Sequence, residues 1–464
     1  MRGIWLRQFP FVSLYVKWVI LNMFWLIETK EQFESYVNST YIRGRIFMEP
    51  ILYNDRVHPA LNNVCMVYLR AYNAPKGHLI CFRHSETQSL DIRLFLKHFE
   101  SGAQEFRNLY VRDKKLCTYF FPSKCLYDMQ FMNPKYIQPQ VTTGAHDYFY
   151  RKYPSKMDIN TIIPVVKHYE KCEQIFEETK DYRESGYYPN SFMFYNIMAT
   201  NTFYWIESQG IGVDKKKLDN HFDYNNAAYS LNGSKIYTQY NLNTTTKRPS
   251  NSFNGINFAA LSKTDGSRKS FVPENDKFLE FDIDSYHPSL IANQIEYELP
   301  KDKGFHQHMA EVYGVSYEKS KELTFKQLYG GVFKEYEDLE FFKKTKSFIN
   351  RLYGEYSRKG EVEVPISKYY LNKDVLGAMN PQKLFNYYLQ NLESATNVRI
   401  LWTIMKDVLK GKNTKLVLYT YDSFLFDYDN REKDIKPKLE KIFKTYNLKI
   451  KAKHGTNYNS LREL

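Results

Sequence analysis

The chain has 464 residues, of which 43% are hydrophobic and 25% charged; this composition excludes a disordered protein and leaves room for two or three domains. The net charge of +13 favours a polyanionic partner, with nucleic acid as the first candidate, although a generally basic surface would show the same excess. The five cysteines include no CxxC pair, which argues against a disulfide framework or a zinc site and for a reducing, cytoplasmic compartment.

The N-terminal segment contains an apolar run, Phe9–Leu21, that is interrupted by Pro10 and Lys17. This run is too short for a transmembrane helix, and no small-residue cleavage site follows it, so we expect neither a membrane span nor a signal peptide. Met23 is an alternative start of translation, and we therefore treat residues 1–22 as an extension.

Residues 23–140 contain short β-prone runs, separated by turn residues, and one helical pattern, which together predict an α/β domain. The polar stretch 141–160 is the predicted linker. From residue 161 the apolar positions follow mostly helical spacing, and the first long helix is expected to end at Gly210. The runs behind these predictions are FWLIETKEQFESYV, GRIFMEPILY, NVCMVYLRAY, GHLICFRH, SLDIRLFLKHF and SFMFYNIMATNTFYWIESQGIGVD.

Two aspartates stand out because each belongs to a hydrophobic strand pattern. Asp282 ends the run Phe278–Phe281, and Asp422 lies in the middle of the β-prone run Leu416–Tyr428. A buried carboxylate is costly unless a cation or a metal pairs with it. On adjacent strands the two carboxylates would hold divalent cations suited to phosphoryl transfer. The alternative is that they are two unrelated aspartates at strand ends.

A helical pattern lies between the two aspartates. Lys321, Phe325 and Tyr329 recur at i, i+4 and i+8, followed by Gly330, so their side chains share one face of the helix. A cation and two aromatic rings on one face suit a triphosphate, a nucleobase and a template base. An amphipathic helix end with a glycine cap would show the same spacing.

The order of these motifs resembles the polymerase domain of family A DNA polymerases, the class of bacterial DNA polymerase I. The helix motif of that family is K-x3-F-x3-Y-G, its first strand motif ends in Asp, and its third strand motif is H-D-E. Blocks similar to its T-G-R-x-S…N and N-x3-Q motifs lie in the same order, and the resemblance spans about 195–430. The matching residues are Thr246, Arg248, Asn257, Asp282, Lys321, Phe325, Tyr329, Gly330, Asn386, Gln390 and Asp422.

The resemblance implies an α+β fold, a right-hand polymerase over residues 161–464 with palm, fingers and thumb. The palm would carry Asp282 and Asp422, the thumb would lie at about 190–235, and the fingers at about 300–360. An RNase H-like, exonuclease-type α/β domain would precede it, over residues 23–140.

The resemblance also implies the roles of the charged residues. Asp282 and Asp422, with the backbone carbonyl of Ile283, would hold two Mg²⁺ ions, with Mn²⁺ as the alternative metal. Lys321 would neutralise the triphosphate and protonate the leaving pyrophosphate.

The remaining positions would bind nucleotide, primer or template. Phe325 and Tyr329 would line the nucleotide pocket, and His287 is either a steric gate against ribose or a structural histidine. Arg248 and Gln390 would sense base-pair geometry in the minor groove, where all pairs share acceptor positions. The residues expected to contact primer or template are Arg248, Asn257, Asn386, Gln390, Tyr329 and Gly330.

The chain departs from the family pattern at two motifs. Tyr317 stands where the family has an Arg four residues before the helix Lys, so phosphate binding must rely on Lys319, Lys321 or another cation. Ser423 replaces the second acid of H-D-E, which leaves one carboxylate on that strand. Asp284 competes with Asp282 for the role of metal ligand, and the spacing favours Asp282.

The N-terminal domain resembles the 3′–5′ exonuclease domain that precedes this polymerase, but most of its acids are absent. Its first motif reads Glu49-Pro50-Ile51, Cys117 occupies the position of the second motif's Asp, and Asp128 remains. Two cations cannot be held without those ligands. We therefore predict a degenerate domain without exonuclease activity; a site built from other residues is the alternative.

The sequence as a whole predicts a DNA polymerase that extends a primer on a DNA template with dNTPs, without proofreading, alone or with replication accessory proteins. The alternatives are an RNA polymerase or primase-like variant of the same fold and a catalytically dead nucleic-acid-binding protein. The compact size and the 40 Tyr and 33 Phe, typical of an AT-rich genome, indicate a phage, a virus or a mobile element.

Overall fold

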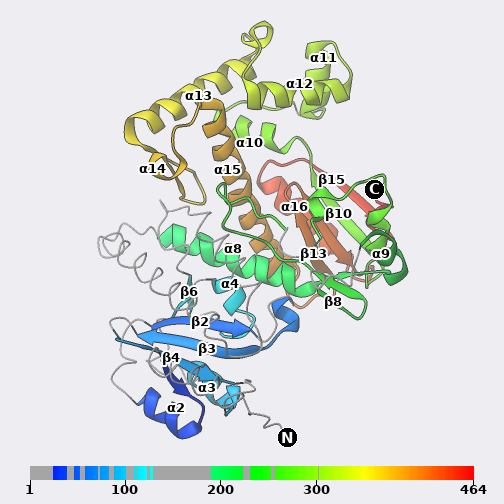
Figure 1. Ribbon diagram of the computed structural model, residues 1–464. Helices are drawn as coiled ribbons and strands as arrows, with labels where there is room; N and C mark the ends of the chain where they lie inside the picture. The colour runs from blue at the N-terminus through cyan, green and yellow to red at the C-terminus, as the bar shows by residue number, and fades with distance from the viewer. Residues whose placement is uncertain are drawn as a thin grey trace, which may run out of the picture. The chain divides into compact units, whose positions relative to one another are not determined.

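The computed structural model divides the chain into two compact units (Figure 1). We call residues 1–133 with 140–187 the N-terminal unit, and residues 134–139 with 188–464 the C-terminal unit. The predicted extension and linker lie outside the described residues, and the predicted domain boundaries stay a prediction. The structure describes residues 24–38, 46–52, 58–71, 74–82, 88–100, 109–111, 113–122, 126–128, 190–222, 230–251, 256–300 and 302–464.

The N-terminal unit is built on a mixed six-stranded sheet with the strand order β1-β4-β3-β2-β5-β6. Strands β1 and β4 pair in parallel, β4, β3 and β2 pair antiparallel, and β2, β5 and β6 pair in parallel. The elements are β1 (Phe24–Ile27), α2 (Lys30–Val37), β2 (Ile46–Leu52), η2 (Pro59–Leu61), β3 (Val64–Ala71), β4 (Gly77–Cys81), α3 (Ile92–Glu100), β5 (Leu109–Val111), α4 (Lys114–Cys117) and β6 (Leu126–Asp128).

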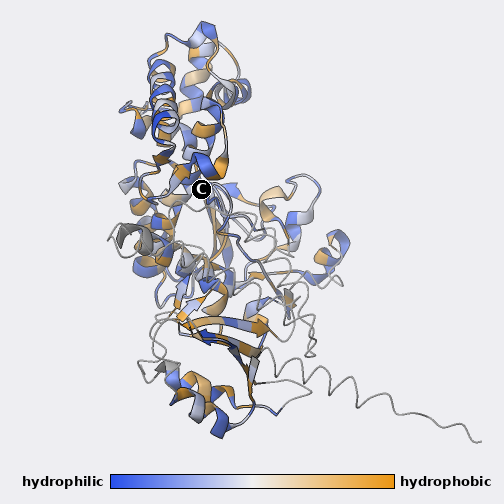
Figure 2. Ribbon diagram, turned by 60° about the vertical axis from the view of Figure 1, so that its left-hand side comes forward, coloured by the Kyte–Doolittle hydropathy of each residue, from blue (hydrophilic) through white to orange (hydrophobic). Residues whose placement is uncertain are grey.

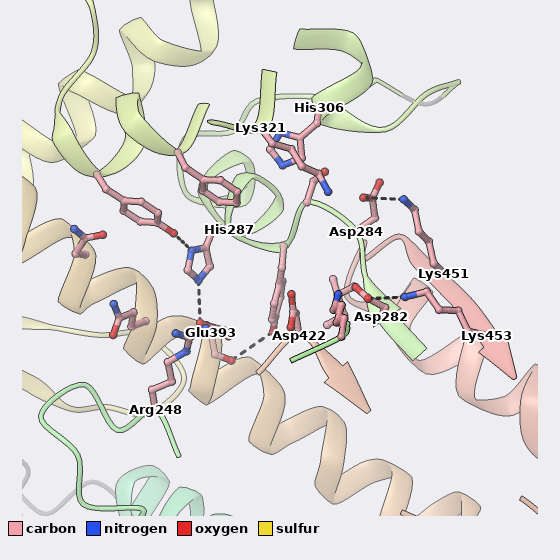
Figure 3. Close-up of a pocket in the computed structure, with 18 of the residues that line it drawn as sticks. Arg248, Asp282, Asp284, His287, His306, Lys321, Glu393, Asp422, Lys451 and Lys453 are labelled. Carbon is pink, nitrogen blue, oxygen red and sulfur yellow. Dashed lines mark hydrogen bonds and ion pairs between the residues drawn. The ribbon is translucent and has the colours of Figure 1, made fainter. Parts of the chain in front are cut away.

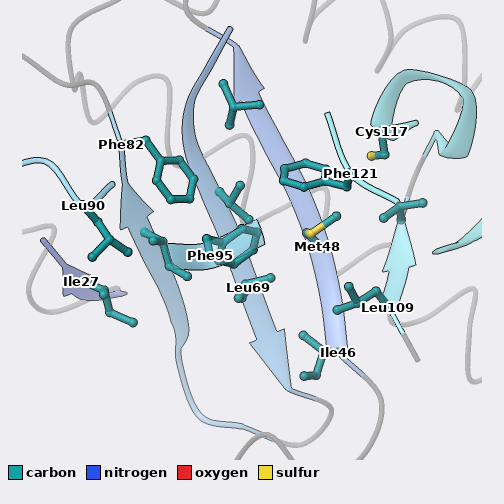
Figure 4. Close-up of a cluster of buried hydrophobic side chains, with 14 of the residues drawn as sticks. Ile27, Ile46, Met48, Leu69, Phe82, Leu90, Phe95, Leu109, Cys117 and Phe121 are labelled. Carbon is teal, nitrogen blue, oxygen red and sulfur yellow. The ribbon is translucent and has the colours of Figure 1, made fainter. Parts of the chain in front are cut away.

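Apolar, β-prone sequence explains the sheet, because nearly every side chain of β2, β3 and β4 is buried. Hydrophobic colour runs along these strands in Figure 2. The core is aromatic at its centre, where Phe95 of α3 packs against Phe82 and Phe121 (Figure 4). Helix α2 begins with a capping box in which Thr29 and Gln32 satisfy each other's backbone N–H groups. The predicted strands and helices of this unit are confirmed.

The C-terminal unit combines a sheet with a larger set of helices. Strands β13-β14-β10-β15-β16 form an antiparallel sheet, and two small sheets, β7-β9-β8 and β11-β12, lie outside it. The elements are α8 (Asn190–Gln209), β7 (Ile211–Gly212), α9 (Lys215–His221), β8 (Ser230–Asn232), β9 (Lys235–Tyr237), η6 (Phe258–Ala260), η7 (Ser267–Ser270), β10 (Lys277–Ile283), α10 (Tyr286–Gln294), α11 (Phe305–Tyr313), α12 (Tyr317–Gly330), η8 (Lys334–Tyr336), α13 (Glu340–Lys359), β11 (Glu361–Glu363), β12 (Tyr370–Asn372), α14 (Lys373–Leu376), α15 (Pro381–Thr403), η9 (Ile404–Val408), β13 (Lys415–Thr420), β14 (Ser423–Tyr428), α16 (Ile435–Thr445), β15 (Ile450–Gly455) and β16 (Arg462–Glu463).

The longest helix, α15, organises this unit, since it contacts α8, α10, α12, α13 and α16 (Figure 1). Asn380 caps its N-terminus and Pro381 occupies its first position, which is the favoured start signal of a helix. Helix α8 ends where predicted, at Gly210, whose φ of +67° suits glycine. Among the described residues no helix is long and apolar enough to span a membrane.

The structure corrects one prediction about this unit, the single strand around Asp422. The run Leu416–Tyr428 is not one strand with an interior acid, as expected, but a β-hairpin: β13 ends at Thr420, and Asp422 lies in the turn before β14. Helix α8, in the range predicted as thumb, packs against α15 and β13, and helices α11 to α13 lie in the range predicted as fingers. The thumb and fingers assignments themselves stay predictions.

Candidate active site

The hairpin turn brings the two predicted aspartates to the same end of the five-stranded sheet. Strand β10 pairs with β14 so that Asp282 lies opposite Ser423, the residue after Asp422. The N–H of Ile283 donates to the carbonyl oxygen of Asp422 at 2.8 Å. Asn397 of α15 fixes the turn from the other side, because its amide donates to the Tyr421 carbonyl oxygen at 2.8 Å.

The ionised form of Asp422 is disfavoured by its surroundings. The residue is exposed at the pocket surface, yet the surrounding protein desolvates its carboxylate. This burial, and then the negative charge of Asp282, raise the pKa of Asp422 to about 6. A carboxyl whose pKa is raised by burial and by a nearby carboxylate is a common feature of functional sites.

Lysines of the neighbouring strand β15 already pair with the acids of β10. The Lys453 ammonium donates to Asp282 Oδ2 at 2.9 Å and lies 3.4 Å from Glu280 Oε2, and Lys451 Nζ lies 3.7 Å from Asp284 Oδ1 (Figure 3). Burial disfavours the Lys453 ammonium, but the hydrogen bond to Asp282 and the nearby carboxylates outweigh it and raise the lysine pKa.

The acid missing after Asp422 is partly replaced from another strand. Ser423, which stands at the position of that acid, donates its hydroxyl to Glu280 Oε1 at 2.8 Å. Glu280 lies two residues before Asp282 on the same face of β10, and its side chain is 8% exposed. A buried carboxylate, bonded to Ser423 and paired with Lys453, therefore lies next to the aspartate pair without lining the cavity.

The predicted face of α12 lies across the pocket from these acids. Lys321, Phe325 and Tyr329 all line it, and the two rings are parallel, with an interplanar angle of 3° and centroids 5.9 Å apart. Phe325 is 38% exposed, which leaves its ring accessible to a planar ligand. His306 contacts Phe325 and stays uncharged near neutral pH, because burial and then the charge of Lys321 lower its pKa to about 4.

A buried carboxylate joins three parts of the site. Glu393 of α15 accepts from Arg248 Nη2 at 3.2 Å and lies 2.9 Å from the His287 Nε2 atom (Figure 3). His287 also bonds, through Nδ1, to the Tyr329 hydroxyl. The Arg248 guanidinium stacks on the Tyr421 ring at 3.7 Å, next to Asp422.

One cavity of about 730 Å³ collects most of the predicted residues. It is large enough for a nucleotide. Asn386 and Gln390 line it from α15, and the Oδ1 atom of Asn386 has no hydrogen-bond partner. The predicted residues that line the cavity are Arg248, Asp282, Ile283, His287, Lys321, Phe325, Tyr329, Asn386, Gln390 and Asp422.

Three predicted residues do not line it. Lys319 lies on the exposed side of α12, where its ammonium pairs with Glu322 at 2.8 Å. Asn257 is exposed at the start of η6, and Gly330 is the last residue of α12, with Gly331 at the C-cap position. A phosphate contact from Lys319 stays a prediction, since the lysine lies outside the cavity lining.

Several residues that line the cavity were missed by the sequence analysis. Four are cations or acids on strands or on α15: Lys451 and Lys453 on β15, Glu463 on β16 and Glu393 on α15; β15 and β16 carry no recognisable motif. Glu393 follows Gln390 by three residues on one face of α15 and was the easiest to find from helical spacing. The missed residues are Lys263, Ser285, Tyr286, His306, Glu393, Lys451, Lys453 and Glu463.

The aspartate pair fits a divalent cation by its chemistry. Carboxylate and backbone carbonyl oxygens are the ligands of Mg²⁺ and Mn²⁺, and a cation would relieve the repulsion that raises the pKa of Asp422. In the described part of the chain no group of three or more His, Cys, Asp or Glu side chains forms a metal cluster, so water or substrate oxygens would complete the coordination.

Comparison with known proteins identifies the fold of the chain. No family model and no curated protein matches the chain. A solved structure of the polymerase domain of Pol1 from M. smegmatis, in complex with DNA primer-template and dNTP, is similar over 94% of this chain and 99% of that one, with a TM-score of 0.67. The chain has the right-hand polymerase fold. At 11% identity the likeness extends to the fold alone. The assignment of site residues therefore depends on the geometry of this chain and not on the similar polymerase.

Proposed function

We propose that this protein is a template-directed DNA polymerase that extends a primer with dNTPs. One observation carries the proposal: Asp282 and Asp422 lie in the same cavity as the Lys321, Phe325 and Tyr329 face of α12. A pair of candidate metal ligands opposite a cation that can neutralise a triphosphate suits nucleotidyl transfer, and the two aromatic rings suit a nucleobase. The right-hand polymerase fold supports it, since the solved polymerase domain with that fold holds primer-template and dNTP.

In the proposed reaction the primer 3′-hydroxyl gives its proton to water and its oxygen forms a bond to the α-phosphorus. The bond to the bridging oxygen breaks, and pyrophosphate leaves with the electron pair. Asp282, Asp422 and the Ile283 carbonyl would hold two Mg²⁺ ions, with Mn²⁺ as a substitute. Bound there, the metal would stabilise charge on the attacking and leaving oxygens. Lys321 would neutralise the triphosphate and give a proton to the leaving pyrophosphate.

Cations other than Lys321 would share the triphosphate. Tyr317 lies where an arginine was expected, and the Lys321 ammonium sits 4.8 Å above its ring, so Tyr317 orients that lysine without adding charge. Lys451 and Lys453 lie on the opposite side of the cavity and bring positive charge close to the aspartates.

The base and sugar would be held between α12 and α15. Phe325 and Tyr329 would stack against the incoming base and the template base. His287 would face the sugar, and Arg248 and Gln390 would contact the primer terminus in the minor groove. Asn386 would contact the template, because the unpartnered Oδ1 atom needs a donor.

The N-terminal unit is proposed to be an exonuclease-like domain without activity. Glu49 is buried within β2, Cys117 is buried in α4, and Asp128 accepts the Lys114 N–H at 2.8 Å. Each of the three positions thus belongs to the packing of the unit. Synthesis without proofreading, family A membership, a phage, viral or mobile-element origin, and replication accessory partners stay predictions.

The test is Mg²⁺-dependent primer extension by the full chain, with dNTPs and separately with NTPs. We expect dNTP extension that is lost in Asp422→Asn and kept in Asp407→Asn, an exposed aspartate of η9 that does not line the cavity. Extension with NTPs alone would favour an RNA polymerase. DNA binding without any incorporation would show that the fold serves binding only.

A further inference from the structure

The contacts of His287 carry a further inference, which rests on the proposed function. Its side chain is 13% exposed and lines the cavity between α10 and α12. Both ring nitrogens are engaged: Nε2 faces Glu393 Oε2 at 2.9 Å, and Nδ1 faces the Tyr329 hydroxyl. These two contacts, rather than the ring alone, decide what His287 can offer a sugar.

Glu393 determines which nitrogen carries the proton. Its side chain is 1% exposed, and it receives hydrogen bonds as a carboxylate beside the Arg248 guanidinium. An ionised carboxylate accepts and cannot donate, so the His287 Nε2 atom must carry the hydrogen. In the neutral ring Nδ1 is then an acceptor, and the Tyr329 hydroxyl donates to it.

A ring with both nitrogens occupied presents only C–H groups to the cavity. A deoxyribose placed against it loses nothing, because it has no 2′-hydroxyl. A ribose would bring a hydroxyl against atoms that neither donate nor accept, and would lose the water that had solvated it. Burying a hydroxyl without a hydrogen-bond partner is unfavourable, and any steric clash adds to that cost.

We propose that Glu393 is a specificity-determining residue: by occupying His287 Nε2 it denies a ribonucleotide the hydrogen bond that this imidazole would otherwise give. Glu393 acts through His287 and does not touch the nucleotide, so it is a positioning residue. The same carboxylate pairs with Arg248, whose guanidinium stacks on the Tyr421 ring and so lies beside Asp422. A single buried acid therefore orients the sugar side and the primer side of the site.

The two roles predict different effects for two substitutions. Glu393→Ala frees His287 Nε2 to donate to a 2′-hydroxyl, and we expect the preference for dNTP over NTP in kcat/KM to fall by about tenfold to a hundredfold. Glu393→Gln keeps an oxygen that accepts from Nε2–H but turns an N–H group toward Arg248. We expect it to lower incorporation of both nucleotides by about tenfold and to keep the preference within about threefold of wild type.

Tyr329→Phe provides a second test that leaves no buried charge unpaired. It frees Nδ1, the other ring nitrogen, as an acceptor for the 2′-hydroxyl, and we expect the sugar preference to fall in the same direction. This variant decides the matter if Glu393→Ala does not fold. The matched control is Glu207→Gln: Glu207 is also fully buried and accepts the Tyr240 N–H at 2.6 Å, but it does not line the cavity.

The experiment measures single-nucleotide incorporation of dNTP and NTP by the full chain on one primer-template. A lower sugar preference in Glu393→Ala, or in Tyr329→Phe where Glu393→Ala does not fold, with Glu207→Gln unchanged, would support the inference. An active Glu393→Ala that keeps the wild-type preference, or, where that variant does not fold, an active Tyr329→Phe that keeps it, would overturn the inference and leave the proposed function standing. A wild type that incorporates neither nucleotide would overturn both.

Discussion

Each unit of the chain has a sheet strand that carries an aspartate at or near its C-terminal end, but the two carboxylates have different surroundings. In the N-terminal unit Asp128 ends β6 and accepts the backbone N–H of Lys114 at 2.8 Å, at the first residue of α4. In the C-terminal unit Asp282 lies next to the end of β10, beside Asp422, with its Oδ2 atom bonded to the Lys453 ammonium.

The difference shows how a structural acid can be told from a functional one. The Asp128 oxygen satisfies a helix N–H that has no partner within its own helix, so the carboxylate completes the fold. The Asp282 carboxylate contacts no backbone N–H among the contacts described for it, and its charge adds to the burial that raises the pKa of Asp422. We interpret the two acids as a candidate cation site, in which a bound cation would offset the burial and the negative charge that disfavour the ionised form of Asp422.

The largest effect should come from making the same substitution in both places. We expect Asp282→Asn to reduce nucleotide incorporation about a thousandfold or more, since it removes a carboxylate from the metal site. Asp128→Asn should leave incorporation unchanged and lower the free energy of unfolding by about 1 kcal/mol, because a neutral acceptor replaces a charged one. Incorporation assays and urea unfolding of both variants check this; loss of activity in Asp128→Asn would break the comparison.

A second, smaller effect separates two lysines of α12. Lys321→Met should lower kcat/KM for dNTP about a hundredfold, because the variant loses the charge that faces the triphosphate. Lys319→Met is the matched control on the same helix: it removes an exposed ion pair with Glu322 and should change kcat/KM less than about twofold. Equal losses in the two variants would mean that general positive charge, and not the cavity, binds the nucleotide.

These lysines also show what the sequence could predict. The i, i+4, i+8 spacing places Lys321, Phe325 and Tyr329 on one face, and they all line the cavity. The same geometry places Lys319 on the other side of the helix, since residues two positions apart, such as Lys319 and Lys321, differ by about 200° in direction. The prediction for Lys319 considered its charge without the phase of the helix, and of the two lysines only Lys321 lines the cavity.

Other features could not be predicted from local pattern. The turn at Asp422 depends on Tyr421, which has a φ of +65°, a conformation that aromatic residues rarely adopt and that no Gly or Asn announced. Glu393 and Lys453 matter through partners more than a hundred residues away in the chain, such as Arg248 and Asp282. Such pairs follow from strand register and helix packing, which are properties of the whole fold.

The stability of the N-terminal unit should fall at acidic pH because of His78. This ring is 8% exposed, packs between Trp25 and Tyr36, and has no hydrogen-bond partner for Nδ1, and burial lowers its pKa to about 4. A pKa below the unfolded value of 6.5 means that stability is complete above pH 6.5 and is lost as the pH falls toward 4. The loss at pH 5 should be about 2 kcal/mol.

The variant His78→Phe isolates that contribution, since His306 in the C-terminal unit has a similarly lowered pKa and adds its own acid sensitivity. Calorimetric unfolding of both proteins between pH 4.5 and 7.5 should show a flatter pH dependence in the variant. Parallel curves would mean that His78 is solvated or paired in solution.

The smallest expected effect is that of Asp422→Asn on stability. It separates the two units most directly, because Asp422→Asn should raise stability whereas Asp128→Asn should lower it. The folded pKa of Asp422 lies at about 6, above the ordinary value of 3.8, so the folded state loses stability as the pH rises from 3.8 through 6. In EDTA at pH 8, Asp422→Asn should therefore unfold at a temperature about 1–3 °C higher than wild type, a modest gain because solvent screens the exposed carboxylate. The gain should shrink at pH 4.5, where the wild-type acid is protonated in the fold. An Asp422→Asn protein that is inactive yet more stable, beside an Asp128→Asn protein that is active yet less stable, would show that the sheet of the C-terminal unit gives up stability to keep its acids in place.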